Sequence, residues 1–247
     1  MNRFWGHTLS VTALALVAGS SVPACAHDDA SLFVQAVLAP PVPSGGTCTY
    51  VPNATAAVLS NGVVDAAILP TGNGYGEVLL VGNTLIPQGN ATIPNSETSR
   101  IEVQGAIIQV IDPASNATVE NNSVLTAGEV DPASGSAPSY AAIGVQMMSA
   151  AAVAHFAPAS GGGARVALVY VTLYGQTLGG QNIQSNQFQW PVNICSGCLV
   201  SVPAGSKTGY CQGDTTALAT QTFCSPGVDQ SEDCQFCYPL SVCNRTP

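Results

Sequence analysis

Residues 164–174, ARVALVYVTLY, form the most β-prone run of the chain. Their β-branched and aromatic side chains suit a pleated strand better than a helix. Other runs with strand character follow at short intervals on both sides, at 56–68, 74–86, 100–112, 140–148 and 187–195. Gly, Pro and Asn separate these runs and are typical of turns. The sequence therefore predicts a mainly β chain, folded as an immunoglobulin-like antiparallel β-sandwich.

Two of these runs predict specific features of the sheets. Residues 74–86 are apolar on both faces at their centre, which is typical of a buried middle strand. Within 100–112, Ile101 and Val103 lie on one face, but the alternation is lost after Gly105. A glycine at such a change of phase predicts a β-bulge or a close approach of another group to the backbone.

Turn and edge signals add two further expectations. Asn61-Gly62 divides the run 56–68 and is a strong signal for a two-residue hairpin turn. Pro191 lies in the alternating run 187–195 and cannot donate to a hydrogen-bond ladder. We therefore expect a hairpin within the first run and an edge strand at the second.

One short helix is expected at 150–156, AAAVAHF. Ser149 directly before this segment can act as its N-cap, and Pro158 ends it. The sequence thus predicts a β-sandwich with one short helix.

The N-terminus indicates export and a lipid anchor. A basic start and an apolar stretch of about ten residues end in small residues, which is typical of a signal peptide and too short to span a bilayer. Val22-Pro23-Ala24-Cys25 resembles a bacterial lipobox, which predicts cleavage before Cys25 and lipidation of that cysteine. Two alternatives remain open: cleavage after Ala26, giving a soluble secreted or periplasmic protein, or cleavage after Ala24, leaving a free thiol.

The domain organisation follows from these signals and from a change in composition. Residues 1–24 are predicted to be the signal peptide, 25–47 a lipidated leader with the first strand, and 48–194 the β-sandwich domain. The last 53 residues hold seven cysteines and few aliphatic side chains. Such a segment is too small and too polar to fold around a core of its own. We therefore predict a disulfide-rich irregular tail at 195–247.

The cysteines other than Cys25 are even in number and favour structural disulfides. In an oxidising compartment this is the simplest interpretation, with metal binding and redox chemistry as alternatives for the two C-x-x-C pairs. If all are paired, Cys48 must bond to a tail cysteine, but the pairing itself stays open. The expected disulfide cysteines are Cys48, Cys195, Cys198, Cys211, Cys224, Cys234, Cys237 and Cys243.

Composition and motifs argue against several functions. After removal of the signal peptide, four Lys and Arg stand against fourteen Asp and Glu, so nucleic-acid binding is not expected. Catalytic motifs with a G-x-S-x-G, H-E-x-x-H or P-loop pattern are not found. His155 is expected to be a capping or surface residue. Two acidic groups are weak calcium candidates: Glu129 with Asp131, and Asp229, Glu232 and Asp233. We predict no catalytic residues, no metal and no cofactor.

Several stretches together carry a family resemblance. These are TCTYVPNA, VLLVGNTLI, ETSRIEVQGAIIQV, GGQNIQSNQFQWPVNICSGCLV and CSPGVDQSEDCQFC. With the lipobox, they make the chain similar to a group of uncharacterised lipoproteins of myxobacteria, which have a β-rich body and a cysteine-rich C-terminal tail. The resemblance covers nearly all of the mature chain and implies an envelope location and disulfides, without implying an activity.

The expected function is accordingly that of a non-enzymatic cell-envelope lipoprotein. We expect a structural or adhesive surface module, held at the outer membrane or cell surface through Cys25 and facing a protein or glycan partner. The alternative is an extracellular or periplasmic binding module for a small molecule, a glycan or a metal ion.

Overall fold

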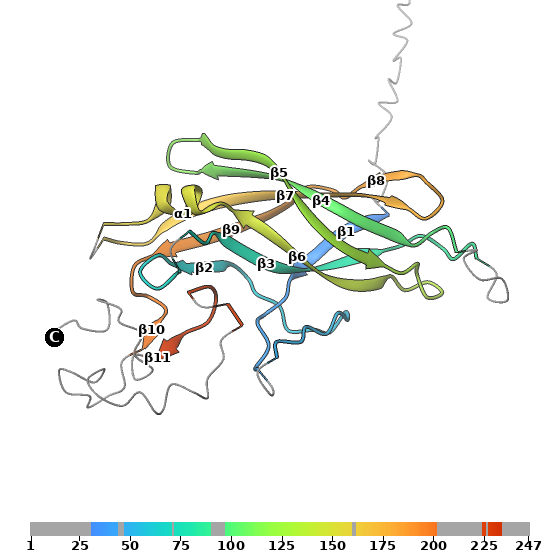
Figure 1. Ribbon diagram of the computed structural model, residues 1–247, viewed down its shortest axis with the longest axis horizontal. Coiled ribbons are helices and arrows are strands. Elements are labelled where there is room, and N and C mark those ends of the chain that lie inside the picture. The colour runs from blue at the N-terminus through green and yellow to red at the C-terminus, as the bar shows by residue number, and fades with distance from the viewer. Residues whose placement is uncertain are drawn as a thin grey trace, which may run out of the picture.

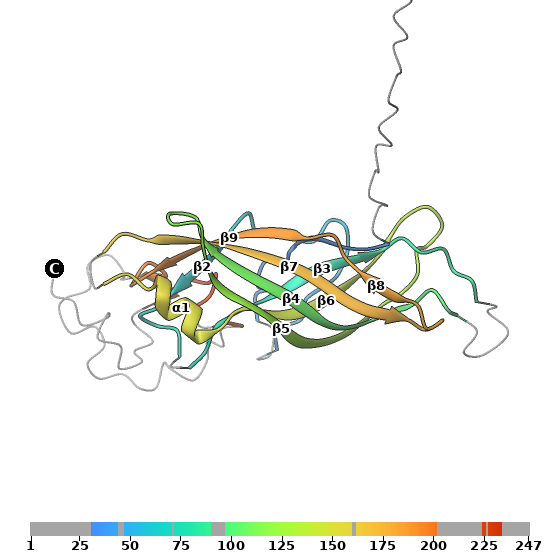
Figure 2. The ribbon, with the colours of Figure 1, turned by 90° about the horizontal axis from the view of Figure 1, so that it is seen from above.

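A computed structural model describes residues 31–43, 47–70, 72–89, 97–159, 162–201, 224–225 and 227–233 of the 247-residue chain. Two β-sheets pack face to face in an elongated sandwich (Figures 1 and 2). The smaller sheet has the order β1-β3-β6, with strands β1 (Leu32–Val37), β3 (Tyr75–Asn83) and β6 (Ser139–Met148). The prediction of a mainly β sandwich is confirmed.

The larger sheet has the order β2-β9-β7-β4-β5, and β8 also pairs with β7. Its strands are β2 (Gly62–Asp65), β4 (Ile101–Asp112), β5 (Ala117–Val130), β7 (Arg165–Thr177), β8 (Asn182–Gln184) and β9 (Phe188–Cys195). A separate small pair joins β10 (Val200–Ser201) and β11 (Glu232–Asp233) in parallel.

The core lies between the two sheets, and alternation along the strands fills it. On β7 every second side chain is fully buried, namely Ala167, Val169, Val171 and Leu173. They meet apolar side chains of the smaller sheet such as Leu79 and Val81, which are also fully buried. Strand β3 lies between β1 and β6, as expected for a middle strand.

The glycine in β4 marks a bulge, as predicted. The pairing register of β4 shifts between Val103 and Gly105 against both of its neighbours. A Cβ atom at Gly105 would collide with the hydroxyl of Tyr174 on β7. The bulge and the close approach therefore occur at the same residue, and the close approach requires glycine.

The hairpin predicted at Asn61-Gly62 is wrong. Gly62 begins β2, which pairs in parallel with β9 over Val192–Cys195. Asn61 does lie in a bend. After this bend, however, the chain does not fold back on the preceding residues but pairs with the distant strand β9. Tertiary pairing has overridden the local preference, and β2–β9 is a parallel pair within the larger sheet.

The prediction that residues 187–195 form an edge strand is also wrong. Strand β9 lies between β7 and β2. Pro191 pairs with Leu168 of β7, and it lies just before the segment of β9 that pairs with β2. The pairing of β9 with β2 thus begins one residue after Pro191. Pro191 therefore does not need to donate a hydrogen bond to β2, although β9 is an interior strand.

The short helix forms as predicted. Helix α1 (Ala150–Phe156) begins after Ser149, whose Oγ accepts a hydrogen bond from the Ala152 N–H at 3.2 Å. Glu120 of β5 accepts hydrogen bonds from the N–H and the hydroxyl of the same serine. Among the described residues, no helix is both long enough and apolar enough to cross a membrane.

Candidate functional site

One end of the sandwich gathers α1, β2 and the last residues of β9 (Figures 1 and 2). Here part of the C-terminal tail binds to the free edge of β2. Val228 forms an antiparallel bridge with Val64, Asp229 N–H donates to Val63 O at 3.0 Å, and Asp65 N–H donates to Gly227 O at 2.9 Å. We call residues 224–225 and 227–229 the docked segment.

A disulfide fixes the start of the docked segment. Cys224 is bonded to Cys48 across a sequence separation of 176 residues, with the two Cα atoms 5.6 Å apart. The expectation that Cys48 pairs with a tail cysteine is therefore confirmed. The bond ties the segment between β1 and β2 to the tail that follows β9.

The docked segment brings a second acid to a buried one. Glu77 of β3 is 5% exposed. Its buried Oε1 atom has no hydrogen-bond partner among the described residues. The carboxyl group of Asp229 acts on that of Glu77 and raises its pKa, and the Tyr75 hydroxyl, two residues before Glu77 on β3, donates to the same Asp229 carboxyl. Two acids from distant parts of the chain thus meet in a site from which water is largely excluded.

Asp229 is held in place by both of its oxygens. The Val63 N–H donates to Oδ1 at 2.6 Å, and the Tyr75 hydroxyl donates to Oδ2 at 3.3 Å. The residue has a φ of 52°, a conformation that Asp and Asn adopt more readily than most side chains. The backbone therefore turns sharply at the point where the carboxyl enters the site.

Tyr75 connects the acids to the larger sheet. Its side chain is fully buried, and its hydroxyl accepts a hydrogen bond from the indole N–H of Trp190 at 2.9 Å. A Cβ atom at Gly62 would collide with this hydroxyl and with the Trp190 indole. The glycine at the start of β2 thus makes room for the contact between the two aromatic side chains.

The surroundings of the acids favour their neutral forms. Burial, together with the hydrogen bond and the charge of Asp229, raises the pKa of Glu77 to about 10. Burial likewise raises the pKa of Asp229 above its usual range. A proton held between the two carboxyl groups would remove their repulsion and give Glu77 Oε1 a partner.

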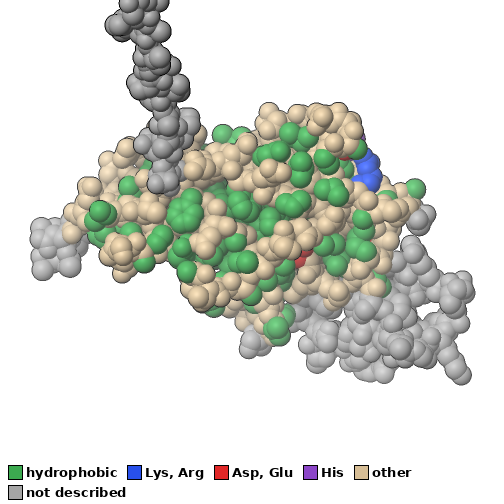
Figure 3. All heavy atoms as spheres, turned by 180° about the vertical axis from the view of Figure 1, so that it is seen from behind, with side chains coloured by type: hydrophobic (Ala, Val, Ile, Leu, Met, Phe, Trp, Pro, Cys, Tyr) green, Lys and Arg blue, Asp and Glu red, His purple; other side chains and the backbone are tan. Residues whose placement is uncertain are grey.

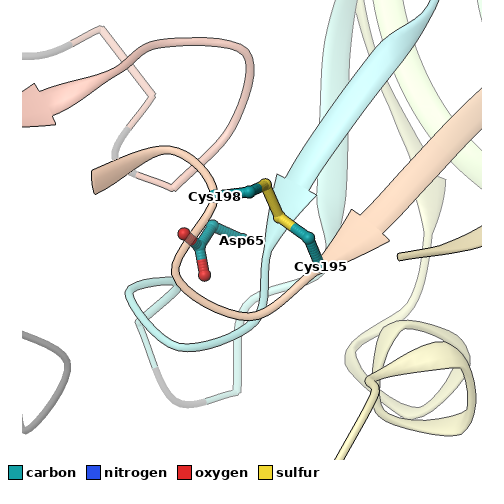
Figure 4. Close-up of side chains that lie close together, drawn as sticks. All are labelled: Asp65, Cys195 and Cys198. Atoms are coloured by element: carbon teal, nitrogen blue, oxygen red, sulfur yellow. A yellow bond between two sulfur atoms is a disulfide. The ribbon is translucent and has the colours of Figure 1, made fainter. Parts of the chain in front are cut away.

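A second buried acid organises the first C-x-x-C segment. Asp65, at the end of β2, is fully buried, and its carboxylate accepts hydrogen bonds from the N–H groups of Ala67 at 3.0 Å, Gly197 at 2.7 Å and Leu199 at 2.9 Å. Figure 4 shows the loop after β9 curling around this carboxylate, with the Cys195–Cys198 disulfide beside it. The loop is therefore fixed by its own backbone amides.

The Asp65 group was also a possible metal site. One ligand atom from each of Asp65, Cys195 and Cys198 falls within 4.8 Å of the others. However, the two sulfur atoms are bonded to each other, which leaves no thiolate for a metal. The carboxylate oxygens are already occupied by three amides. The arrangement supports structural disulfides over metal binding, as expected from the sequence, and it assigns Cys195 and Cys198 to each other.

A cavity of about 500 Å³ opens beside the docked segment. Neutral hydrogen-bonding side chains line it together with glycine backbone and a few apolar groups, and three of its lining residues, Cys224, Ser225 and Val228, come from the docked segment. The remaining lining residues are Leu69, Gly72, Asn73, Gly74, Gly76, Gln146, Ser149 and Ala150. The lining suits a neutral polar molecule better than an ion.

Other residues singled out in the sequence have structural roles. His155 is exposed on α1, as expected, with its ring against Phe156. Glu129 and Asp131 form ion pairs with Arg100 at 3.5 and 2.8 Å, which explains why these acids cluster. Of the remaining candidates, Asp229 acts on Glu77, and the backbone of Glu232 and Asp233 forms β11.

Several predicted residues lie outside the part of the chain that the structure describes. They include the lipidation site Cys25 and the cysteines Cys211, Cys234, Cys237 and Cys243. Glu77 and Asp65, in contrast, are described but were missed in the sequence. Each is a single acid within an apolar strand segment, YGEVLLVGN and GVVD, and that isolation was the available signal.

Comparison of the chain with models of known protein families gives no match, and neither does comparison with curated protein sequences.

Proposed function

We propose that this protein is an exported lipoprotein, anchored through Cys25, that acts by contact as a structural or adhesive surface module and not as an enzyme. The observation that carries the proposal is the Cys48–Cys224 disulfide, which links distant segments of the chain. Such bonds form and persist in oxidising compartments outside the cytoplasm. This agrees with the signal peptide and the lipobox at the N-terminus.

The outer face of the larger sheet supports a role in contact. Tyr170 and Tyr174 alternate with the buried row of β7 and so point outwards. By register, Ile107 and Leu125 lie on the same face, and they are 41% and 90% exposed. Tyrosine is enriched where proteins bind partners, and an exposed group of apolar side chains is typical of an interaction site. We call these four residues the outer face.

The charge distribution also suits an uncharged partner. Figure 3 shows a broad surface of the molecule on which hydrophobic and uncharged polar side chains mix and charged side chains are few. Only 8% of all residues in the chain are charged. Binding to such a surface depends on shape and apolar contact more than on electrostatic attraction, and it would therefore depend weakly on salt.

A second candidate function rests on the cavity beside the docked segment. Asn73, Gln146, Ser149 and Ser225 offer it both donors and acceptors, and no charged side chain is among its lining residues. A neutral, hydroxyl-rich small molecule or a glycan end would match these groups. The chain would then serve as a binding module of the envelope.

The anchor is tested by comparing the wild-type chain with Cys25→Ala after fractionation of the native host. We expect the wild type in the membrane fraction and the variant in the soluble exported fraction. Equal partition of both chains would contradict the anchor.

The contact role is tested with purified Cys25→Ala protein in a binding assay on intact cells. Replacing Ile107 and Leu125 by Ser should lower binding at least tenfold, whereas Val42→Ser, a change at another residue that is 90% exposed, should not. If binding survives loss of the outer face and is competed by simple sugars, the cavity is the functional site instead.

A further inference from the structure

The docked segment is attached to the sandwich in two chemically different ways. Cys224 is bonded covalently to Cys48. A few residues later, Asp229 is attached by hydrogen bonds to Val63 and Tyr75, and its carboxyl acts on the buried, unpartnered Glu77. The covalent attachment is permanent in an oxidising compartment, while the second depends on the charge state of two acids.

The acid contact cannot persist with both groups ionised. Glu77 is 95% removed from solvent, and water cannot screen two negative charges in such a site. The Glu77 Oε1 atom also lacks a donor among the described residues. A single proton between the carboxyl groups satisfies both conditions, because it cancels the repulsion and supplies the missing donor.

A metal cation is a poorer occupant of the same place. Calcium takes six to eight oxygen ligands, usually including water. Here both Asp229 oxygens already accept hydrogen bonds, one from Val63 and one from Tyr75, and the site is buried. The other titratable groups that act on the pair are Tyr75 of β3 and Tyr50, which are neutral at physiological pH and add no positive charge.

We propose that Glu77 and Asp229 share one proton and that this proton fastens the docked segment to the edge of β2, so that losing it frees the segment while the Cys48–Cys224 bond keeps it tethered. The proposal goes beyond the envelope role and does not depend on the lipid anchor. We call this reversible, proton-dependent attachment of the docked segment to the edge of β2 the clasp.

Opening of the clasp would alter the neighbouring cavity. Cys224, Ser225 and Val228 form one of its walls and belong to the docked segment. A neutral molecule bound in the cavity would contact these three residues while the acid pair is protonated. It would lose these contacts after the proton is lost. Because burial raises the pKa values of both acids, opening should accompany a rise in pH.

The experiment measures hydrogen exchange at the amides of Val63 and Asp65, which bond to Asp229 Oδ1 and to Gly227 O. The full disulfide-bonded chain is examined between pH 5 and pH 9, and each rate is divided by the intrinsic rate at that pH. In the wild type, protection should fall as pH rises, by up to about tenfold per pH unit while one proton is lost. Glu77→Gln should abolish this dependence, since an amide can donate to Asp229 without titrating.

The control is Glu102→Gln, the same change at an exposed position of β4, which should behave as the wild type. If Glu77→Gln does not fold, Asp229→Asn tests the same contact from the other side. A pH dependence equal in wild type and in these variants overturns the proposal, as does constant protection in the wild type. Recovery of protection at pH 9 on adding calcium would assign the site to a cation instead.

Discussion

The Asp65 carboxylate accepts a 2.7 Å hydrogen bond from the backbone N–H of Gly197, across 132 residues of chain. Together with its bonds to Ala67 and Leu199, this contact joins the end of β2 to the loop that leaves β9. A buried carboxylate with three amide donors is a stable arrangement, because its charge is compensated without a cation. Asp65 therefore fixes the point at which the tail departs from the sandwich.

Loss of this carboxylate should be costly. We expect Asp65→Ala to lower the free energy of unfolding by about 3 kcal/mol or more, because it leaves buried amides without partners. Asp131→Ala is the matched control. Its carboxylate is 66% exposed and pairs with Arg100 at the surface, so the loss should be under about 1 kcal/mol. If urea unfolding gives both variants the same loss in the free energy of unfolding, the amide bonds to Asp65 do not stabilise the fold as proposed.

The two disulfides should contribute unequally to stability. The Cys48–Cys224 bond spans 176 residues, and the chain-entropy model gives it about 5 kcal/mol. The Cys195–Cys198 bond spans three residues, and the same model gives it about 2 kcal/mol. Replacing each pair by Ser and comparing denaturant midpoints tests this order. A larger loss for the short bond would mean that the loop beside Asp65 depends on its disulfide more than on its amides.

A side chain at position 62 should destabilise the folded protein. A Cβ atom there would displace the Tyr75 hydroxyl from the Trp190 indole, so we expect Gly62→Ala to lower stability by about 1–3 kcal/mol. A shift in Trp190 fluorescence should accompany the change. Gly144→Ala, in strand β6, is the control, since a Cβ atom there meets nothing within 4 Å. Similar behaviour of the two variants would contradict the close packing seen at Gly62.

Stability should decline with rising pH because of the Glu77–Asp229 pair. The pKa of Glu77 is raised from 4.5 to about 10, so the folded state holds a proton that the unfolded state has lost. The associated stability is complete below pH 4.5 and is lost as pH rises towards 10, by up to about 1.4 kcal/mol per pH unit. The raised pKa of Asp229 acts in the same direction.

Urea unfolding at pH 5 and at pH 9 measures this effect below the range in which the tyrosines titrate. The free energy of unfolding should fall more between the two values in the wild type than in Glu77→Gln, and the variant should be the more stable at pH 9. A wild type that is more stable at pH 9 than at pH 5 would show that the pair is ionised in the folded state.

Features set by local sequence could be predicted. The Ser149 cap of α1 and the bulge at Gly105 depend on neighbouring residues, and both appear where expected. The pairing of Cys48 with a tail cysteine followed from parity, although its partner Cys224 did not. In each of these cases, the side chain of one residue, or its absence in glycine, allows few local structures or bonding partners.

Features set by distant contacts could not be predicted. Asn61-Gly62 carries a good hairpin signal, yet β2 pairs in parallel with β9, where Val64 is fully buried. Glu77 meets Asp229 only when the tail lies along β2, and no local pattern indicates this meeting. An isolated acid within an apolar strand is a useful signal that a buried partner exists, but it does not identify the partner.

The proposed function requires an exported chain that is anchored at Cys25 and closed by disulfides. The most direct test is the intact mass of the mature protein from its native membrane fraction, with and without reduction. We predict a chain that starts at Cys25, carries a diacylglyceryl group and gains eight hydrogens on reduction, two for each pair formed by the eight cysteines other than Cys25. A soluble chain that starts at His27, or a mass that does not change on reduction, would contradict it.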